Sequence, residues 1–386
     1  MISIHSQIWL CWLFRIPKSI LPILRTAGTR CQINVKEKVV ENILPRYFSG
    51  IFRAIVVEEI NLSGINVTII LAVEHSSGPK LPEHRKLLVG CFHAELKLVH
   101  TVEDAIHFTN HHKVDLLLVN MPLYPLLSQS KDLYPDLKII LYGNCTIEDY
   151  SLELKGEHIR LLDHFIYWRE DSSFCQLELL TTLQKIIRGD IFGIEKYLDG
   201  GATSATFPVL GTKSREVLVQ EVEDFCRSCS LSSNITRKAK AVTEELIMNA
   251  IYDAPIAAGQ TRYEDMRNLV FELEPGDRSI LTIGCDSEVL VIGIKDPFGA
   301  FKRDKFFDYA NKIVYRYDNE RLIDTKVGGA GLGIFKMLYD SNGLVLNVAP
   351  GETTEVIAIV EMTLKSQAFT KMGRSLHYFS VPPKVV

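Results

Sequence analysis

Between about Val67 and Ile187 the chain alternates short apolar runs with helix-like segments. The apolar runs read VTIILAV, AELKLV, VDLLLV, LKIILY and HFIYW, and amphipathic stretches such as TVEDAIHFTNHH separate some of them. Near-continuous apolar strands indicate a sheet that is covered on both faces, and the strand–helix rhythm favours parallel pairing. The pattern predicts a doubly wound parallel sheet that ends with a helix near 177–187.

A different pattern follows the segment RGDIFGIEKYLDGGATSATFP, whose glycine, serine, threonine and proline residues are typical of an interdomain connection. SREVLVQEVEDFCRSC and TRKAKAVTEELIMNAIYDAP have helical periodicity, and Ser233 or Asn234 is expected to cap the second helix. The runs NLVFELE, SILTIGC, VLVIGIKDPFGAF and GETTEVIAIVEM predict strands. This half is therefore expected to be an α/β domain of another kind.

These patterns divide the 386 residues into five parts. We expect an unassigned amino-terminal extension at 1–63, a parallel α/β domain at 64–190, a linker at 191–213, a second α/β domain at 214–366 and a tail at 367–386. The extension contains IWLCWLF, which is too short for a membrane span. A net charge of -4 from nearly balanced acids and bases gives no support for nucleic-acid binding.

Glu245 and Asn249 stand four residues apart in the second predicted helix, so they share one helical face. A carboxylate and a carboxamide placed in this way can orient an attacking water or hydroxyl and ligate Mg²⁺ beside a γ-phosphate. Such a pair often arises by chance on a helix, so its meaning depends on what surrounds it.

Two later elements supply that context. An apolar strand ends on Asp296 with Gly299 close behind, and a buried aspartate at a strand end can accept a hydrogen bond from the adenine amino group. Thr354, in the last strand, could hydrogen-bond near the adenine, although an ordinary strand position is the more frequent explanation.

The strongest single signal is KVGGAGLGIFKMLYD, in which Gly328, Gly329, Gly331 and Gly333 lead directly into a predicted helix. Glycines expose successive backbone N–H groups, and a helix amino terminus adds a positive dipole, so the element suits a polyphosphate. A dinucleotide-binding loop of Rossmann type is disfavoured, because these glycines follow a polar segment rather than an apolar strand and no βαβ unit surrounds them.

The first domain resembles the receiver domain of bacterial response regulators, which has a flavodoxin-like fold. A working receiver needs a magnesium-binding acidic cluster and a phosphoacceptor aspartate, whereas here strand one is followed by the single acid Glu74 and strand three ends at Asn120. An amide cannot form an acyl phosphate. The resemblance therefore implies a pseudo-receiver that acts through protein contacts.

The second domain resembles the Bergerat-fold ATP-binding domain of gyrase, histidine kinases and MutL, from Ser214 to about Leu364. EELIMNA resembles its N box, DPFG and GGAGLG its two glycine boxes, and GETTEV its final strand motif. The resemblance implies an α/β sandwich that binds ATP and Mg²⁺. It implies Glu245 as general base, Asn249 as the Mg²⁺ ligand and Asp296 as the adenine contact, and nucleotide contacts from Asp253, Gly299, Lys326 in the lid, Gly328, Gly329, Gly331, Leu332, Gly333 and Thr354.

Two departures shape the functional expectation. Pro297 and Phe298 stand before Gly299, where the first glycine box usually has a glycine two residues after the aspartate, and neither His158 nor His164 has the context of an autophosphorylated histidine. A standard histidine kinase is therefore not expected. The glutamate–asparagine spacing resembles anti-sigma-factor serine kinases, which implies a cytoplasmic bacterial signalling protein.

Two modes of action stay open. One is phosphorylation of a serine or threonine on a protein partner that resembles an anti-sigma antagonist or a sigma-factor-like regulator. The other is a non-catalytic switch, in which nucleotide changes the binding of a partner. The sequence also leaves open whether the chain forms a homodimer.

Overall fold

The computed structural model describes residues 68–76, 78–81, 94–123, 126, 137–144, 162–170, 172–266, 268–306, 332–364, 369 and 372–381. All of them belong to one compact unit, Ser63–Val386. The predicted amino-terminal extension lies outside the described residues, as do Lys326, Gly328, Gly329 and Gly331.

The first half of the unit is a parallel sheet in the strand order β2-β1-β3-β4-β5. This is the flavodoxin-like order, in which the chain reverses direction across the sheet between β1 and β3. Most apolar residues of β1, β3, β4 and β5 are buried, as expected for strands covered on both faces, whereas the edge strand β2 buries only Leu96. The elements are β1 Thr68–Val73, β2 Ala94–Val99, α6 Val102–His111, β3 Leu116–Asn120, β4 Lys138–Gly143, β5 His164–Tyr167 and α9 Ser173–Arg188.

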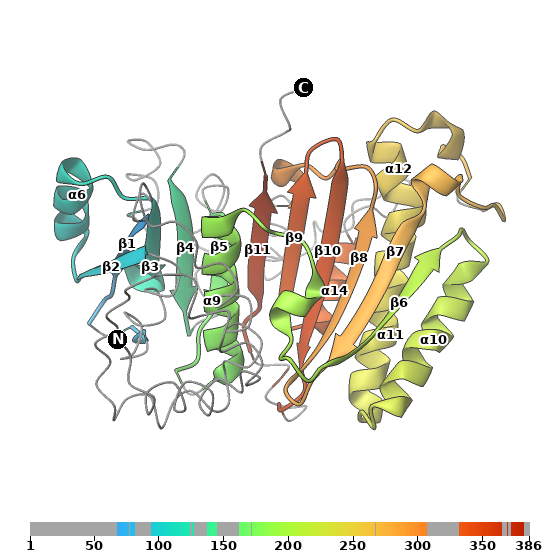
Figure 1. The fold of residues 1–386 in the computed structure, drawn as a ribbon, viewed down its shortest axis with the longest axis horizontal. Coiled ribbons are helices and arrows are strands. Elements are labelled where there is room, and N and C mark those ends of the chain that lie inside the picture. The colour runs from blue at the N-terminus through green and yellow to red at the C-terminus, as the bar shows by residue number, and fades with distance from the viewer. Residues whose placement is uncertain are drawn as a thin grey trace, which may run out of the picture. The chain divides into compact units, whose positions relative to one another are not determined.

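The second half contains an antiparallel sheet in the order β9-β10-β8-β7-β6. Helices α10, α11 and α14 pack on one face of it (Figure 1). On the opposite face lies the short helix η4, because a side chain at Gly293 would meet Ile194. The bounds are η4 Ile194–Tyr197, β6 Thr203–Val209, α10 Ser214–Ser228, α11 Ser233–Met248, β7 Ser279–Cys285, β8 Val289–Asp296, α14 Leu332–Asp340, β9 Gly343–Ala349 and β10 Thr353–Glu361.

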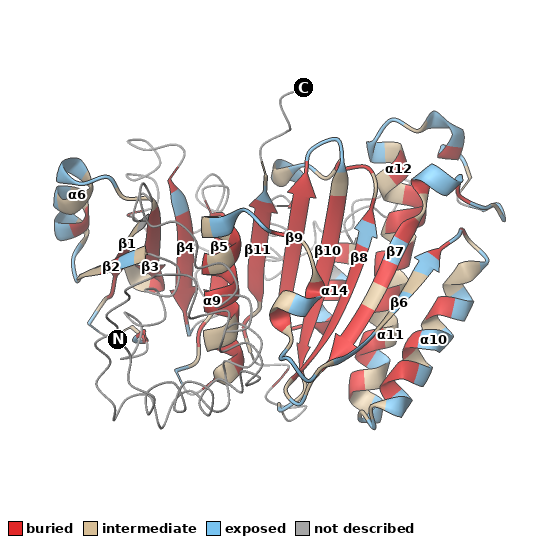
Figure 2. Cartoon of the chain, in the orientation of Figure 1, coloured by how far each residue is buried: buried red, intermediate tan, exposed pale blue. Residues whose placement is uncertain are grey.

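The two halves share one sheet of eleven strands, because β11 (Ser375–Ser380) lies between β5 and β9 (Figure 1). It runs antiparallel to β5 and parallel to β9. Side chains reinforce this position: the Ser375 hydroxyl donates to Glu178 of α9 at 2.9 Å, and His377 Nε2 lies 3.2 Å from the same carboxylate. Most of these strands are buried along their length (Figure 2).

This arrangement differs from the predicted linker and tail. Residues 191–213 include η4 and the edge strand β6, and residues 367–386 include β11. The linker prediction followed the proline and threonine content of TSATFPV. Among the described strands β6 is at the edge of the sheet, paired with β7, and an edge strand tolerates proline. The partners of β11 lie far away in sequence, so no local pattern marks it.

Helix α11, which carries the predicted general base Glu245, is capped at least one residue earlier than predicted. The Ser232 hydroxyl accepts the hydrogen bond from the Ile235 N–H, where Ser233 or Asn234 had been predicted to cap. At its other end α11 passes into one π-helical turn, η5 (Asn249–Asp253), followed by α12 (Ala254–Ala257) with Pro255 in its first turn. A proline within a continuous helix lacks an N–H and crowds the preceding turn, which accounts for the wider turn at Asn249.

Candidate functional site

Glu245 and Asn249 lie against the start of α14. A side chain built at Gly333 would approach Glu245 Oε2 to 2.8 Å and Asn249 Oδ1 to 3.5 Å. The structure therefore brings together three residues that the sequence assigned to one site from two separate motifs. Leu332, another predicted nucleotide contact, is the first residue of α14.

The Glu245 carboxylate has a partner that sequence reasoning missed. Lys336 Nζ, one turn along α14 from Gly333, donates to Glu245 Oε1 at 2.6 Å. The Lys336 side chain is 61% exposed and that of Glu245 is 20% exposed, so solvent screens this ion pair. In this arrangement a lysine neutralises the candidate general base.

Asp296 ends β8 directly opposite Thr354 of β10. It is buried, and its carboxylate accepts a hydrogen bond from the Phe298 N–H at 2.9 Å. Burial raises the pKa of the Asp296 carboxyl to about 6, although the backbone N–H groups of Phe298, Thr354 and Gly299 favour its charged form. The group is thus an ionised, inward-facing acceptor at neutral pH.

Two features of the backbone require glycine at position 299: a positive φ and a close approach of another segment. Its φ is 59°, and an added side chain would collide with the carbonyl oxygen of Ala349. The N–H of Gly351, in the turn between β9 and β10, donates to the Gly299 carbonyl at 3.1 Å. Gly299 does not line the cavity described below, so its observed part is to bring the turn after β8 close to the β9–β10 turn.

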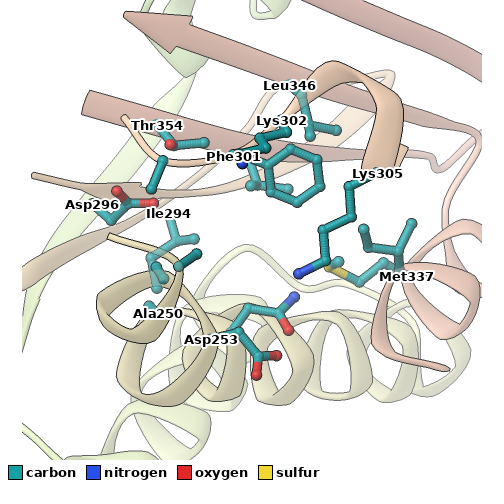
Figure 3. Close-up of a pocket in the computed structure, with 16 residues that line it drawn as sticks. Ala250, Asp253, Ile294, Asp296, Phe301, Lys302, Lys305, Met337, Leu346 and Thr354 are labelled. Carbon is teal, nitrogen blue, oxygen red and sulfur yellow. The ribbon is translucent and has the colours of Figure 1, made fainter. Parts of the chain in front are cut away.

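A cavity of about 310 Å³ opens between β8 and β10 on one side and η5 and α14 on the other (Figure 3). This volume is at the lower end of the range for small-molecule sites. Most of its wall is apolar, with six polar side chains among its lining residues. It is lined by Asn249, Ala250, Asp253, Ala254, Ala257, Ile294, Asp296, Ala300, Phe301, Lys302, Lys305, Ile334, Met337, Leu346, Thr354 and Val356.

Four predicted site residues line this cavity: Asn249, Asp253, Asp296 and Thr354. Glu245 and Gly333 do not line the cavity, but they lie next to Asn249, which does. Phe301, Lys302 and Lys305 line it without having been predicted. A signal for them was present in the sequence, because FKRDK follows the DPFGA motif directly and places cations next to a candidate nucleotide contact.

In the receiver-like half, described residues cover the position at the end of β3 where a receiver would hold its phosphoacceptor. Asn120 is fully buried at the end of β3, and a side chain at Gly78 would collide with it. The Glu74 carboxylate, the single acid after β1, accepts a hydrogen bond from the Leu81 N–H at 2.8 Å. Chain from the loop after β1 therefore occupies this edge of the sheet, and the described residues include no cluster of potential metal ligands there or elsewhere.

Comparison with known proteins adds structural likenesses only. No protein-family model matches the chain, and no curated protein matches it. A response regulator from Thermotoga maritima is 16% identical, with 32% of this chain and 99% of its own covered and a TM-score of 0.23. A sensor protein from Polaromonas sp. JS666 is 18% identical, with 32% and 97% covered and a TM-score of 0.25.

A LuxR family DNA-binding response regulator from Silicibacter pomeroyi is 26% identical, with 34% of this chain and 100% of its own covered and a TM-score of 0.24. The flavodoxin-like topology of the first half rests on its strand order and not on these scores. Among the helices that the structure describes, none has the length and apolar character needed to cross a membrane.

Proposed function

We propose that the chain is a signalling protein that binds ATP with Mg²⁺ in the cavity between β8, β10, η5 and α14. The observation that carries this proposal is the meeting of four sequence motifs around one cavity. Asp296 and Thr354 face each other at one side of it. At the other side, Asn249 and Glu245 lie against Gly333 at the start of α14.

The wall of the cavity suits a purine. Ile294, Leu346 and Val356 offer apolar side chains to the faces of a flat ring, and the Asp296 carboxylate is a buried acceptor for an exocyclic amino group. A buried acceptor of this kind favours a base that can donate to it, because a base without a donor would leave the carboxylate unpaired. Adenine has the required amino group.

The donor set on the other side suits a divalent cation that accompanies phosphates. Asn249 offers an amide oxygen and Glu245 a carboxylate, and both are hard oxygen ligands of the type that Mg²⁺ prefers. When bound, Mg²⁺ would neutralise phosphate charge. Glu245 would hold a proton acceptor close to the γ-phosphate, and the amino terminus of α14 would add its positive dipole.

Phosphotransfer to a serine or threonine of a protein partner is the enzymatic form of this proposal. It requires Glu245 to act as the base, so the ion pair with Lys336 would have to open first. That ion pair favours the second candidate, a switch in which nucleotide changes the contacts of α14 and thereby the binding of a partner protein. The filled receiver-like edge agrees with regulation by protein contact.

Calorimetric titration of ATP into the full chain, with and without Mg²⁺, tests the binding site. We expect Mg²⁺-dependent binding that Asn249→Ala weakens by about tenfold or more, because the variant loses a metal ligand. Asn234→Ala, near the opposite end of the same helix, is the matched control and should bind as the wild type does. A folded wild-type chain that does not bind ATP would contradict the proposal.

Glu245→Gln separates the two modes of action. It keeps the size of the side chain but removes the proton acceptor. A kinase would therefore lose transfer from radiolabelled ATP to its partner while retaining ATP binding, whereas a switch would keep its nucleotide-dependent partner binding.

A further inference from the structure

Two lysines line the cavity from the segment that follows Gly299. Lys302 and Lys305 are both exposed to solvent at its margin. Figure 3 shows the Lys305 side chain extending from the chain after β8 into the cavity, on the same side as Met337 of α14 and away from Asp296 and Thr354. Met337 is in the same helix as Gly333, where an added side chain would lie 3.5 Å from Asn249 Oδ1. Lys305 therefore reaches the end of the cavity that carries the candidate Mg²⁺ ligand.

Two neighbouring cations, Lys336 and Arg303, are engaged in structural contacts, whereas the side chains of Lys302 and Lys305 have no such contact with the residues that the structure describes. Lys336 pairs with Glu245, and Arg303 donates to the Leu162 carbonyl and pairs with Asp163. Within the part of the chain that the structure describes, neither Lys302 nor Lys305 forms an ion pair with a carboxylate. An ammonium group that enters a cavity without a protein partner is available to an anionic ligand.

The charge of the proposed ligand identifies what Lys305 would contact. ATP carries about four negative charges at neutral pH and a bound Mg²⁺ cancels two, so further cations are needed near the terminal phosphates. Adenosine has the same base and sugar without those charges. A cation at the Asn249 end would therefore strengthen the binding of the triphosphate and leave adenosine binding unchanged.

We infer that Lys305 binds the terminal phosphates of a nucleoside triphosphate and makes the cavity selective for triphosphates over nucleosides. This inference rests on the proposed nucleotide site and adds a residue to it that lies outside both glycine motifs. Lys302 lies one turn earlier in the same segment, and it contributes charge to the surroundings without this contact.

Affinities of the full-length chain for ATP, ADP, AMP and adenosine, measured in the presence of Mg²⁺, test the inference. Lys305→Met should weaken ATP binding by about 10- to 100-fold, as expected for the loss of a charge-assisted hydrogen bond to phosphate, and should change adenosine binding by less than about twofold. Lys305→Arg should restore most of the ATP affinity. Lys302→Met, with the same change of net charge, should cost clearly less than Lys305→Met.

The outcomes separate this inference from the function on which it rests. If the wild-type chain binds neither ATP nor adenosine, the nucleotide site itself is wrong and the role of Lys305 falls with it. If the wild type binds ATP but Lys305→Met leaves that affinity unchanged, or lowers ATP and adenosine affinity equally, the role of Lys305 is wrong while the site stands. If Lys305→Met and Lys302→Met lose equal ATP affinity, the loss reflects net charge near the cavity rather than a specific contact from Lys305, and the inference is wrong. Because Lys305 is exposed, both variants should melt at the wild-type temperature.

Discussion

The carboxyl edge of the receiver-like sheet and the cavity beside β8 are the two places where the sequence pointed to chemistry, and the structure differs between them. At the first, Asn120 is covered by the loop that contains Gly78. At the second, an apolar wall remains open and six polar side chains are among the residues that line it. The first place has an amide and is covered, whereas the second has a carboxylate, Asp296, and an open space.

This difference shows that topology and chemistry can be separated within a single sheet. The strand order β2-β1-β3-β4-β5 is that of a flavodoxin-like sheet, although β3 ends at Asn120 rather than at an aspartate. Function must therefore be argued from the side chains that a fold places in an accessible space. The comparison can be tested by substituting residues at the cavity beside β8 and by introducing an aspartate at position 120.

The largest effect is expected at Asp296. Asp296→Ala should weaken ATP binding by about 100-fold, because the amino group of the base would lose its buried acceptor. Binding to the wild type should also weaken as the pH falls through about 6, since protonation removes the negative charge of this carboxyl. Titration calorimetry between pH 5 and pH 8 measures both effects. Binding by the alanine variant with wild-type affinity would contradict the assigned role.

The effect of the same carboxyl on stability has the opposite sign. Its pKa is raised in the folded state, so the native chain binds more protons than the unfolded chain between the ordinary value of 3.8 and about 6. The contribution of Asp296 to the free energy of unfolding therefore rises as the pH is lowered through that interval. Urea unfolding of the wild type and of Asp296→Asn at pH 5 and pH 7 measures this pH-dependent contribution to the free energy of unfolding.

A second, smaller loss is expected at Gly299, which ties the turn after β8 to the β9–β10 turn. Gly299→Ala should lower the free energy of unfolding by about 2 kcal/mol or more, because the new methyl group meets the Ala349 carbonyl and alanine disfavours a φ of 59°. Gly351→Ala is a matched control, since Gly351 also has a positive φ, 74°, but an added methyl group would meet no atom within 4 Å. It should cost only about 1 kcal/mol. Equal losses in the two variants would show that the close approach at Gly299 is unimportant.

The Lys336–Glu245 pair should matter little for stability. Lys336→Met is expected to change the free energy of unfolding by less than about 1 kcal/mol, because solvent screens an ion pair whose lysine is 61% exposed. Chemical denaturation checks this value. A loss of several kcal/mol would mean that the pair holds α14 against α11 rather than merely neutralising Glu245.

The smallest effect is expected when the missing acid is returned to the receiver-like edge. Asn120→Asp should remain unphosphorylated by acetyl phosphate, because the loop around Gly78 still covers the position and Glu74 still binds the Leu81 N–H. Intact-protein mass spectrometry, with an active response regulator as positive control, tests this. A gain of one phosphoryl group would show that the loss of function at this edge lies in one residue and not in its surroundings.

Periodicity and motif spacing predicted much of this structure from local information. The apolar runs predicted the parallel sheet, and the spacing of Glu245 and Asn249 predicted that they share one helical face; their position next to Gly333 followed from the resemblance of the motifs to a known family. What could not be predicted depends on distant partners. The ion pair between Lys336 and Glu245 joins two residues that are 91 positions apart in the sequence. The covering of Asn120 depends on the path of the loop that contains Gly78.

The edge strand β6 and the shared strand β11 were missed for a related reason. TSATFPV has the composition of a connection, and SLHYFS is short, so neither shows a strand pattern that stands out from its own residues. Their pairing energy comes from β7 and from β5 and β9, respectively. Strands of this kind become visible only when the whole sheet is known.

The position of β11 has a consequence for the order of synthesis. The ribosome makes β5 and β9 before it makes β11, so each has an unpaired edge until Ser375–Ser380 has emerged. Unpaired strand edges invite pairing with other chains. A nascent chain that stalls before this strand would expose two unpaired strand edges, those of β5 and β9. Synthesis of β11 would allow both edges to pair with one strand.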